Sequence, residues 1–362
     1  MRASGILMGI SSIPSKYGMG CFSKEAYEFV DQLEQAGQQY WQILPLGPTG
    51  YGDSPYQSVS TFAGNPYFIN LEDLIEKGLL TRGECESCDW GGSESYVDYE
   101  KMYMSRYKLL RKAYERADLS KDEDYADFLK EEQNWLTDYC LFMAIKNDQK
   151  GICWIDWPEE LKDRHSKAVR EAEKELEEEI DFYRFQQYCF TTQWRKLKAY
   201  ANEKGISIIG DVPIYVALDS SDAWANPEML QFDKDHNPKS VAGCPPDAFS
   251  ATGQLWGNPL YDWKKLKATG YDWWVQRMQH CLELYDVVRI DHFRGFDEYY
   301  AIPYGETTAQ KGKWEKGPGM DLFNTLNKKI ENLRVIAEDL GFLTKSVLEM
   351  LKESGYPGMK VL

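Results

Sequence analysis

The sequence predicts an α/β fold, a (β/α)8 TIM-type barrel with helical and loop insertions that lacks its C-terminal strands. Short apolar runs end in an acid at Asp211, Asp291 and Glu338. Helical patterns separate these runs, which is typical of parallel βα units. The 362 residues exceed the roughly 250 of a typical barrel. We therefore expect one domain over residues 1–362 that carries insertions.

The predicted strands are short β-branched or aromatic runs, at 6–10, 40–46, 67–71, 207–211, 287–291, 334–338 and 358–362. Helical spacing predicts connecting helices at 271–284, 322–333 and 344–354. These strands are too few for a closed eight-stranded barrel with its last helices. An open parallel barrel leaves an unpaired strand edge. We therefore expect that a strand is missed or that the domain is incomplete at its C-terminus.

Two segments depart from this alternation. Residues 81–190 are rich in Lys, Glu, Leu and Tyr at helical spacing, which predicts a mainly helical insertion subdomain. Residues 217–263 are rich in Pro, Gly and Trp, which predicts a loop insertion that covers the active site. For its 243–258 part, a rigid Pro-rich connection is the alternative.

The composition excludes several partners. The formal net charge of −16 disfavours nucleic acid and anionic membranes. No apolar run approaches the 18 residues of a membrane span, and the apolar stretch at 5–10 is too short for a signal peptide. The eight cysteines are scattered, which favours a reducing, cytoplasmic location.

No metal and no cofactor are expected. Cys85 and Cys88 form a C-x-x-C without a second pair or a His cluster nearby, whereas structural zinc needs four ligands. The sequence contains no Walker loop, no H-E-x-x-H and no G-x-S-x-G nucleophile elbow.

Asp291 is the first candidate for chemistry. Arg289 lies two positions earlier on the same predicted strand, so both side chains point to one face. A guanidinium there would keep the carboxylate ionised, as a nucleophile requires. A purely structural ion pair at a strand end explains the spacing equally well.

Glu338 is the second candidate, because apolar neighbours at 335 and 336 would raise its pKa toward that of a general acid. An ordinary acid at a helix N-terminus is the alternative. Asp211 ends the preceding strand and would bind substrate hydroxyls or orient Arg289. Two carboxyl groups facing one bond are the usual apparatus for cleaving a glycosidic linkage.

Longer motifs are more specific than these single residues. The segments GDVP at 210–213, RIDH at 289–292 and AEDL at 337–340 resemble the first three sequence regions of the α-amylase superfamily. The segments GDSPYQS at 52–58, FAGNPY at 62–67, AGCPPDAFS at 242–250 and TGQLWGNP at 252–259 resemble the 4-α-glucanotransferase family, also called amylomaltase or disproportionating enzyme.

The resemblance implies a retaining enzyme that acts on α-1,4-glucans and maltooligosaccharides. It implies Asp291 as nucleophile and Glu338 as general acid/base, with Arg289 and His292 beside the cleaved sugar and Asp211 on its hydroxyls. It also implies a glucan groove lined by Tyr56, Asp247, Phe249, Gln254 and Trp256. The family's third catalytic carboxylate follows a later His-Asp motif, and no such motif follows Glu338 in this sequence.

Three functions are therefore compared. A 4-α-glucanotransferase is the leading hypothesis. An α-amylase-type glucan hydrolase would use the same carboxylates with an open acceptor side. An inactive glucan-binding fragment is the third.

Overall fold

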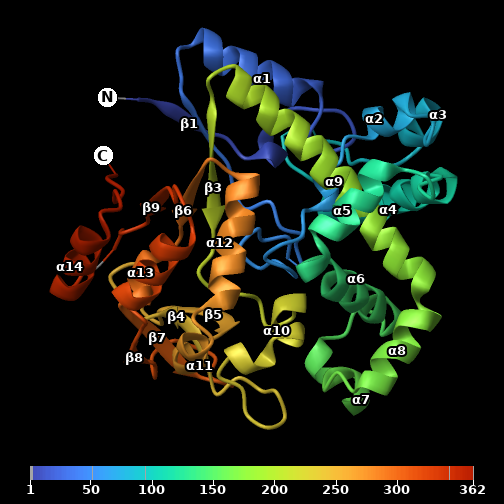
Figure 1. The fold of residues 1–362 in the computed structure, drawn as a ribbon. Helices are drawn as coiled ribbons and strands as arrows, with labels where there is room; N and C mark the ends of the chain where they lie inside the picture. Colours follow the sequence, from blue (N-terminus) through green and yellow to red (C-terminus); the bar gives the residue numbers. More distant parts are fainter. Residues whose placement is uncertain (1–2, 51, 94, 342, 362) are drawn as a thin grey trace. The chain divides into compact units, whose positions relative to one another are not determined.

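A computed structural model describes residues 3–50, 52–93, 95–341 and 343–361. The chain forms two compact units, which Figure 1 colours along the sequence. The first unit takes chain ranges 1–55, 62–151 and 164–209, and the second takes 56–61, 152–163 and 210–362. The predicted bounds of a single domain with insertions at 81–190 and 217–263 stay a prediction.

The first unit is mainly helical in its described residues. Its helices are α1 (Lys24–Gln35), α2 (Leu71–Glu76), α3 (Arg82–Glu86), α4 (Tyr99–Arg116), α5 (Glu123–Glu131), α6 (Gln133–Asp148), α8 (Ser166–Glu175) and α9 (Glu177–Glu203). Helix α9 contacts α1, α4, α5, α6 and α8, so it is the element around which this unit packs (Figure 1).

Side-chain caps explain where several of these helices begin. Thr81 and Glu84 form a capping box at the start of α3, and the Asp98 carboxylate accepts the Lys101 N–H at the start of α4. The strands of this unit are short. β1 (Gly5–Leu7) pairs in parallel with β2 (Tyr40–Gln42), which pairs in parallel with the first residues of β3 (Ser207–Val212).

The second unit contains the end of β3 and two further parallel strands, β6 (Val287–Ile290) and β9 (Val335–Ala337). The strand order of the whole parallel sheet is β1-β2-β3-β6-β9. Helices α12 (Asp272–Leu284), α13 (Met320–Lys329) and α14 (Lys345–Ser354) connect and cover these strands (Figure 1). This parallel sheet confirms the α/β class, and closure into a barrel stays a prediction.

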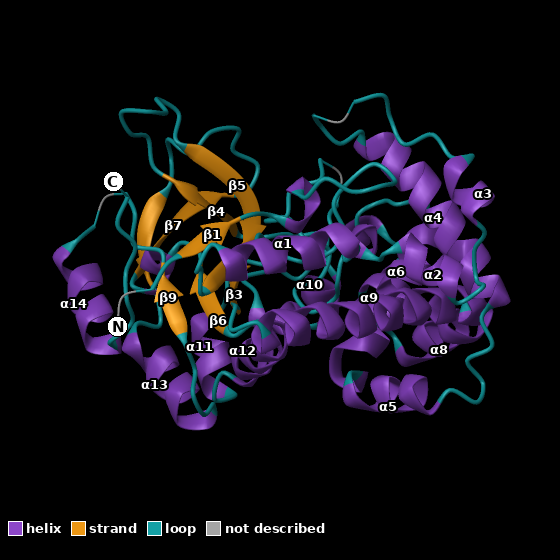
Figure 2. Cartoon of the chain, turned by 90° about the horizontal axis from the view of Figure 1, so that it is seen from above, coloured by secondary structure: helices purple, strands orange, loops and turns teal. Residues whose placement is uncertain are grey.

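A second sheet of the same unit is antiparallel, in the order β5-β4-β7-β8. Figure 2 labels β5, β4 and β7 of this sheet. Its strands are β4 (Ser240–Cys244), β5 (Gln254–Pro259), β7 (Glu298–Pro303) and β8 (Lys313–Lys316). Three short helices complete the unit, α7 (Glu159–Lys162), α10 (Ser221–Ala225) and α11 (Trp263–Ala268). Residues 241, 300, 302 and 309 form a buried apolar cluster of this sheet.

Several predicted elements are wrong in detail. Residues 67–71 are not a strand: a 3-10 turn occupies Pro66–Phe68, and α2 begins at Leu71. Asn65 and Asn70 each accept a main-chain N–H two residues later, and such caps favour helical turns over a strand. The 217–263 segment is no plain loop, because it contains β4 and β5.

The predicted strand at 358–362 is represented in the described residues by one parallel bridge between Gly358 and Ala337. None of the four strands of the antiparallel sheet, at 240–244, 254–259, 298–303 and 313–316, was predicted from the sequence. Each has six residues or fewer, so its alternation is too brief to stand out among the Gly and Pro residues nearby.

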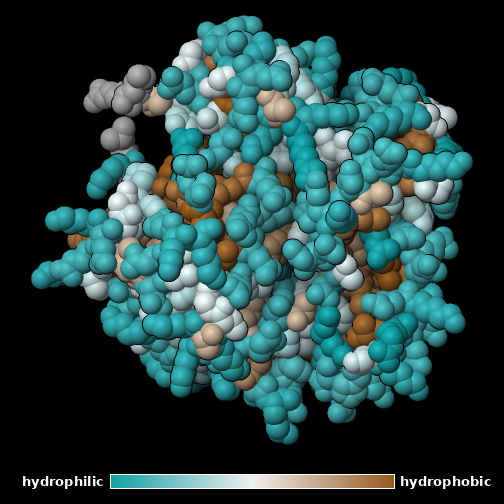
Figure 3. All heavy atoms as spheres, in the orientation of Figure 1, coloured by the Kyte–Doolittle hydropathy of each residue, from teal (hydrophilic) through white to brown (hydrophobic). Residues whose placement is uncertain are grey.

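The visible surface agrees with the charged composition. On the face drawn in Figure 3 most residues are hydrophilic, with smaller apolar areas between them. None of the helices in the described ranges combines the length and apolarity that crossing a membrane requires.

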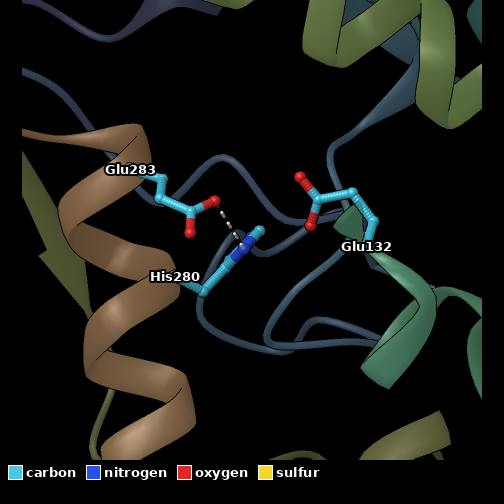
Figure 4. Close-up of side chains that lie close together, drawn as sticks. All are labelled: Glu132, His280 and Glu283. Carbon is cyan, nitrogen blue, oxygen red and sulfur yellow. Dashed lines mark ion pairs between the residues drawn. The ribbon is translucent and has the colours of Figure 1, made fainter. Parts of the chain in front are cut away.

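Three ionisable side chains that were not singled out from the sequence are drawn in Figure 4. His280 and Glu283 lie one turn apart on α12, with 3.9 Å between Nδ1 and Oε2. Glu132, in the first unit, accepts a hydrogen bond from Trp135 Nε1 and pairs with Arg195. Each of these acids has a partner from its own unit, so ordinary ion pairing accounts for these contacts.

Candidate active site

The carboxyl ends of β3, β6 and β9 meet at one edge of the parallel sheet. Ile290 is level with Ala337, so the next residues, Asp291 and Glu338, are level too. Hydrogen bonding continues past the strand ends: the Asp291 N–H donates to Val212 O at 3.0 Å, and the Glu338 N–H donates to Ile290 O at 3.0 Å. The two predicted catalytic acids therefore start from adjacent positions of one sheet edge.

Arg289 joins two of the acids. Its Nη1 donates to Asp211 Oδ1, and lies 2.9 Å from Asp291 Oδ1. The Asp211 side chain is 3% exposed, whereas that of Asp291 is 32% exposed. The guanidinium thus neutralises a buried carboxylate and orients a second one that solvent, or a substrate, can reach.

Tyr56 occupies the other oxygen of Asp211. Its hydroxyl donates to Asp211 Oδ2 at 2.7 Å. Burial and the Asp211 charge raise the pKa of Tyr56, so the phenol stays protonated and acts as the donor. Burial also raises the pKa of Asp211, an effect that the Arg289 charge and the Tyr56 hydrogen bond oppose. Both Asp211 oxygens therefore have protein partners, which favours its predicted role in orienting Arg289.

Glu338 is held by main-chain groups. Its Oε2 accepts the His292 N–H at 2.9 Å, and its Oε1 accepts the Leu340 N–H at 2.7 Å. Burial raises the pKa of Glu338; these two hydrogen bonds oppose the shift, and the Asp291 charge adds to it. Asp291 contacts a guanidinium, whereas Glu338 contacts main-chain N–H groups. A nucleophile and a general acid need such different surroundings.

His292 has a strained backbone that serves this contact. It adopts the left-handed conformation, with φ 53° and ψ 48°, which costs a non-glycine residue roughly 1–2 kcal/mol. This conformation aims its N–H at Glu338. Burial and the Arg294 charge lower the pKa of His292 to about 4, so its ring is neutral. Among the described residues its Nε2 is buried without a hydrogen-bond partner.

Trp256 packs against this histidine. The two rings meet edge to face, with 4.9 Å between their centroids. Trp256 Nε1 donates to Gln254 Oε1 at 3.1 Å, so two of the predicted groove residues on β5 are coupled. The Trp256 carbonyl accepts Gln57 Nε2 at 3.3 Å, and Gln57 Nε2 also donates to Asn258 Oδ1 at 2.9 Å. Sequence reasoning missed Gln57 and Asn258, although both lie inside the quoted motifs.

Asp247 and Phe249 lie in the exposed turn that follows β4. The Asp247 carboxylate accepts the N–H groups of Phe249 and Ser250, at 2.8 and 2.7 Å, so it stabilises its own turn. The Phe249 side chain is 98% exposed. The structure therefore does not bring these two predicted groove residues into contact with the acids.

Cys244 links this turn to the acids and was not predicted. Burial raises its pKa to about 11; the Arg294 charge opposes this shift, and the charges of Asp247, Glu338 and Asp291 add to it. Its thiol is therefore protonated at neutral pH. It is close enough to Asp247 in the turn, and to Asp291 and Glu338 at the sheet end, for their charges to affect its pKa. Its place in the Pro-rich motif was the only signal in the sequence.

Comparison with known proteins identifies relatives over nearly the whole chain. A family profile described as 4-alpha-glucanotransferase matches residues 8–362. A 4-alpha-glucanotransferase of Clostridium butyricum is 52% identical over 356 residues, which are 98% of this chain and 73% of that protein. One of Streptococcus pneumoniae is 49% identical over 363 residues, 100% of this chain and 72% of that protein.

A solved structure agrees with this relationship. The amylomaltase of Streptococcus agalactiae in complex with acarbose superposes with a TM-score of 0.96 at 42% identity. The alignment covers 100% of this chain and 73% of that one.

Proposed function

Because the chain belongs to the 4-α-glucanotransferase family, we propose that Asp291 and Glu338 carry a retaining transfer of α-1,4-glucan segments in this protein. The observation that supports the proposal best is the placement of both acids on adjacent strand ends, with Arg289 on one and two main-chain N–H groups on the other. The proposal includes the role of each site residue as nucleophile, general acid/base or sugar-binding group.

The first half of the reaction forms a covalent glucosyl-enzyme. Asp291, paired with Arg289, attacks the anomeric carbon, and the bond from that carbon to the glycosidic oxygen breaks. Glu338, whose pKa is raised, gives its proton to the departing 4-hydroxyl oxygen of the leaving glucan. Retaining glycosidases hold the two carboxyl groups about 5 Å apart.

The second half releases the sugar to an acceptor. The 4-hydroxyl of another glucan attacks the anomeric carbon, and the ester bond to Asp291 breaks. Glu338, now ionised, takes the proton of that hydroxyl and is ready for the next cycle. Transfer exceeds hydrolysis when the acceptor is held better than water, so contacts on the acceptor side decide the outcome.

Three residues are suited to bind the donor sugar. The buried Nε2 of His292 is available to hydrogen-bond a sugar hydroxyl, and Trp256 beside it offers an aromatic face. Tyr56 adds a hydroxyl that is fixed by Asp211. We propose that Gln254, Asp247 and Phe249 extend this glucan surface, with Phe249 at the exposed tip. Because the S. agalactiae relative was solved with acarbose, acarbose is a suitable first ligand for a binding titration.

Incubation of the purified protein with maltotriose tests the activity. A transferase releases glucose together with a ladder of longer maltooligosaccharides. Growth of reducing ends without a ladder indicates the α-amylase-type hydrolase instead. Saturable binding of maltoheptaose without either product indicates a glucan-binding protein that does not turn over.

Covalent labelling tests the nucleophile, and Asp291→Asn is the variant with the largest expected effect. An activated glucosyl fluoride should label the wild-type protein at Asp291, because fluoride leaves without help from the general acid. The amide cannot form the ester, so labelling and transfer should fall by about 10⁴-fold or more. Asp235→Asn, at an exposed acid of the same unit that lies outside the proposed site, is the matched control. Intact-mass analysis measures the labelling of the variant and of the control. Unchanged labelling of Asp291→Asn would refute the assignment of Asp291 as the nucleophile.

The cysteines support a location. All eight are free thiols, and Cys21, Cys85, Cys140, Cys189 and Cys281 are buried. We infer a reducing, cytoplasmic compartment, which cell fractionation checks.

A further inference from the structure

The segment 357–359 lies beside β9 and has no role in the reaction described so far. The Ala337 N–H donates to Pro357 O at 2.9 Å, and Ala337 forms a parallel bridge with Gly358. The segment therefore lies beside the end of β9, next to Glu338, and it belongs to the same unit as the site.

Asp339 fixes this segment. It follows Glu338 directly, and it is 7% exposed. Its Oδ1 accepts the Met359 N–H at 2.6 Å. A Cβ atom on Gly358 would lie 2.5 Å from Asp339 Oδ2 and 2.7 Å from Cγ, so only glycine lets the carboxylate lie against the main chain here. Of two adjacent acids, one faces the reaction and the other holds a neighbouring segment.

Met359 brings this segment to Arg289. The Arg289 Nε–H donates to Met359 Sδ at 3.2 Å. The same guanidinium uses Nη1 for Asp211 and Asp291. A guanidinium bonded only through Nη1 can pivot about that atom, and a bond at Nε removes this freedom.

The choice of sulfur has an electrostatic reason. Two carboxylates already share the single charge of Arg289, and a third acid would compete with Asp291 for it. A thioether is an uncharged, polarisable acceptor, so it orients the guanidinium without drawing its charge away.

We propose that Met359 is a positioning residue of the transfer reaction, and that Asp339 acts through it. Met359 holds the Arg289 plane, and the plane aims the Asp291 carboxylate at the anomeric carbon. This inference rests on the proposed function, because it requires Asp291 to be the nucleophile.

The test is the rate of covalent labelling by the glucosyl fluoride in Met359→Leu, Met359→Gln and wild type. Leucine keeps the apolar volume and removes the acceptor, so the labelling rate and kcat should fall about tenfold with KM nearly unchanged. Glutamine supplies an amide oxygen at a similar reach and should recover most of the loss. Met104→Leu, at a 67% exposed methionine, is the matched control.

Asp339 gives a second, independent arm. Asp339→Asn keeps the Oδ1 acceptor for the Met359 N–H and should label nearly as fast as wild type, whereas Asp339→Ala should resemble Met359→Leu. Equal rates in wild type and Met359→Leu would overturn the inference. So would equal losses in the Leu and Gln variants together with a lower Tm, because that pattern indicates packing alone. Absence of labelling in wild type would instead overturn the proposed function.

Discussion

The end of the parallel sheet and the turn after β4 differ in how they hold their acids. At the sheet end, Arg289 contacts Asp211 across 78 positions of the sequence, and the His292 N–H reaches Glu338 across 46. In the turn, the Asp247 carboxylate accepts the N–H groups of residues two and three positions away. The first arrangement depends on the fold, whereas the second is made by the turn itself.

We propose that this difference separates the catalytic residues from those that recognise the glucan. Side chains fixed by distant partners keep their geometry when a substrate arrives, as electrostatic catalysis requires. On the same proposal, a turn that is stabilised locally and carries an exposed Phe249 would adapt to glucans of different length. We therefore expect substitutions at the sheet end to lower kcat, and substitutions in the turn to change acceptor use.

After Asp291, the comparison predicts its largest effect on kcat at Glu338. Glu338→Gln keeps the shape but cannot donate a proton, so kcat for maltotriose should fall by about 10³-fold. The glucosyl fluoride should still label Asp291, because its leaving group needs no acid. The basic limb of the kcat/KM profile reports deprotonation of Glu338, whose pKa is raised, and this limb should disappear in the variant. A basic limb that persists would assign it to another group.

A smaller effect is expected at Arg289. Arg289→Lys keeps the charge but cannot bond Asp211, Asp291 and Met359 from one rigid plane. We expect kcat to fall about 100-fold, with KM for maltotriose nearly unchanged. Steady-state kinetics of transfer measure both constants. Equal values for the two enzymes would show that charge alone suffices at this position.

The smallest effect on catalysis is expected in the turn. Phe249→Ala removes an exposed ring and leaves the bonds of Asp247 in place. The acceptor KM should rise about threefold, and the ratio of hydrolysis to transfer should rise with it, since less acceptor surface excludes water. Product analysis against glucose as acceptor checks this. If kcat fell as much in Phe249→Ala as in Arg289→Lys, the turn and the sheet end would not differ in their effect on catalysis.

A pH experiment sharpens the same comparison through stability. His292 has a folded-state pKa of about 4, below its ordinary value of 6.5. As the pH falls, His292 binds a proton in the unfolded chain before it does so in the folded protein. The free energy of unfolding should therefore fall as the pH drops from about 6.5 to 4. The fall should be smaller in His292→Gln. Urea titrations at several pH values measure it, with His165→Gln as the exposed control.

The sequence predicted the sheet end better than its surroundings. Asp211, Asp291 and Glu338 each end a β-branched run, and parallel pairing alone brings such ends together. The two roles proposed for Asp211 stay predictions; the structure adds that Arg289 and Tyr56 each contact one of its oxygens.

Other features depended on contacts between distant segments. Nothing local marks Met359 as a partner of Arg289, 70 positions away. The run at 67–71 resembled a strand, but asparagine caps at 65 and 70 favoured helical turns. Local side-chain capping outweighed β-propensity there.

The hydrogen bonds that continue past Val212 and Ile290 also limit how this protein can diverge. Side chains alternate along a strand, so deleting Val287 or Val288 would turn Arg289 and Asp291 to the opposite face together. An insertion between β4 and β5 would displace neither. Length changes should therefore accumulate among relatives in that connection and be purged from the strand, whatever glucan each enzyme prefers.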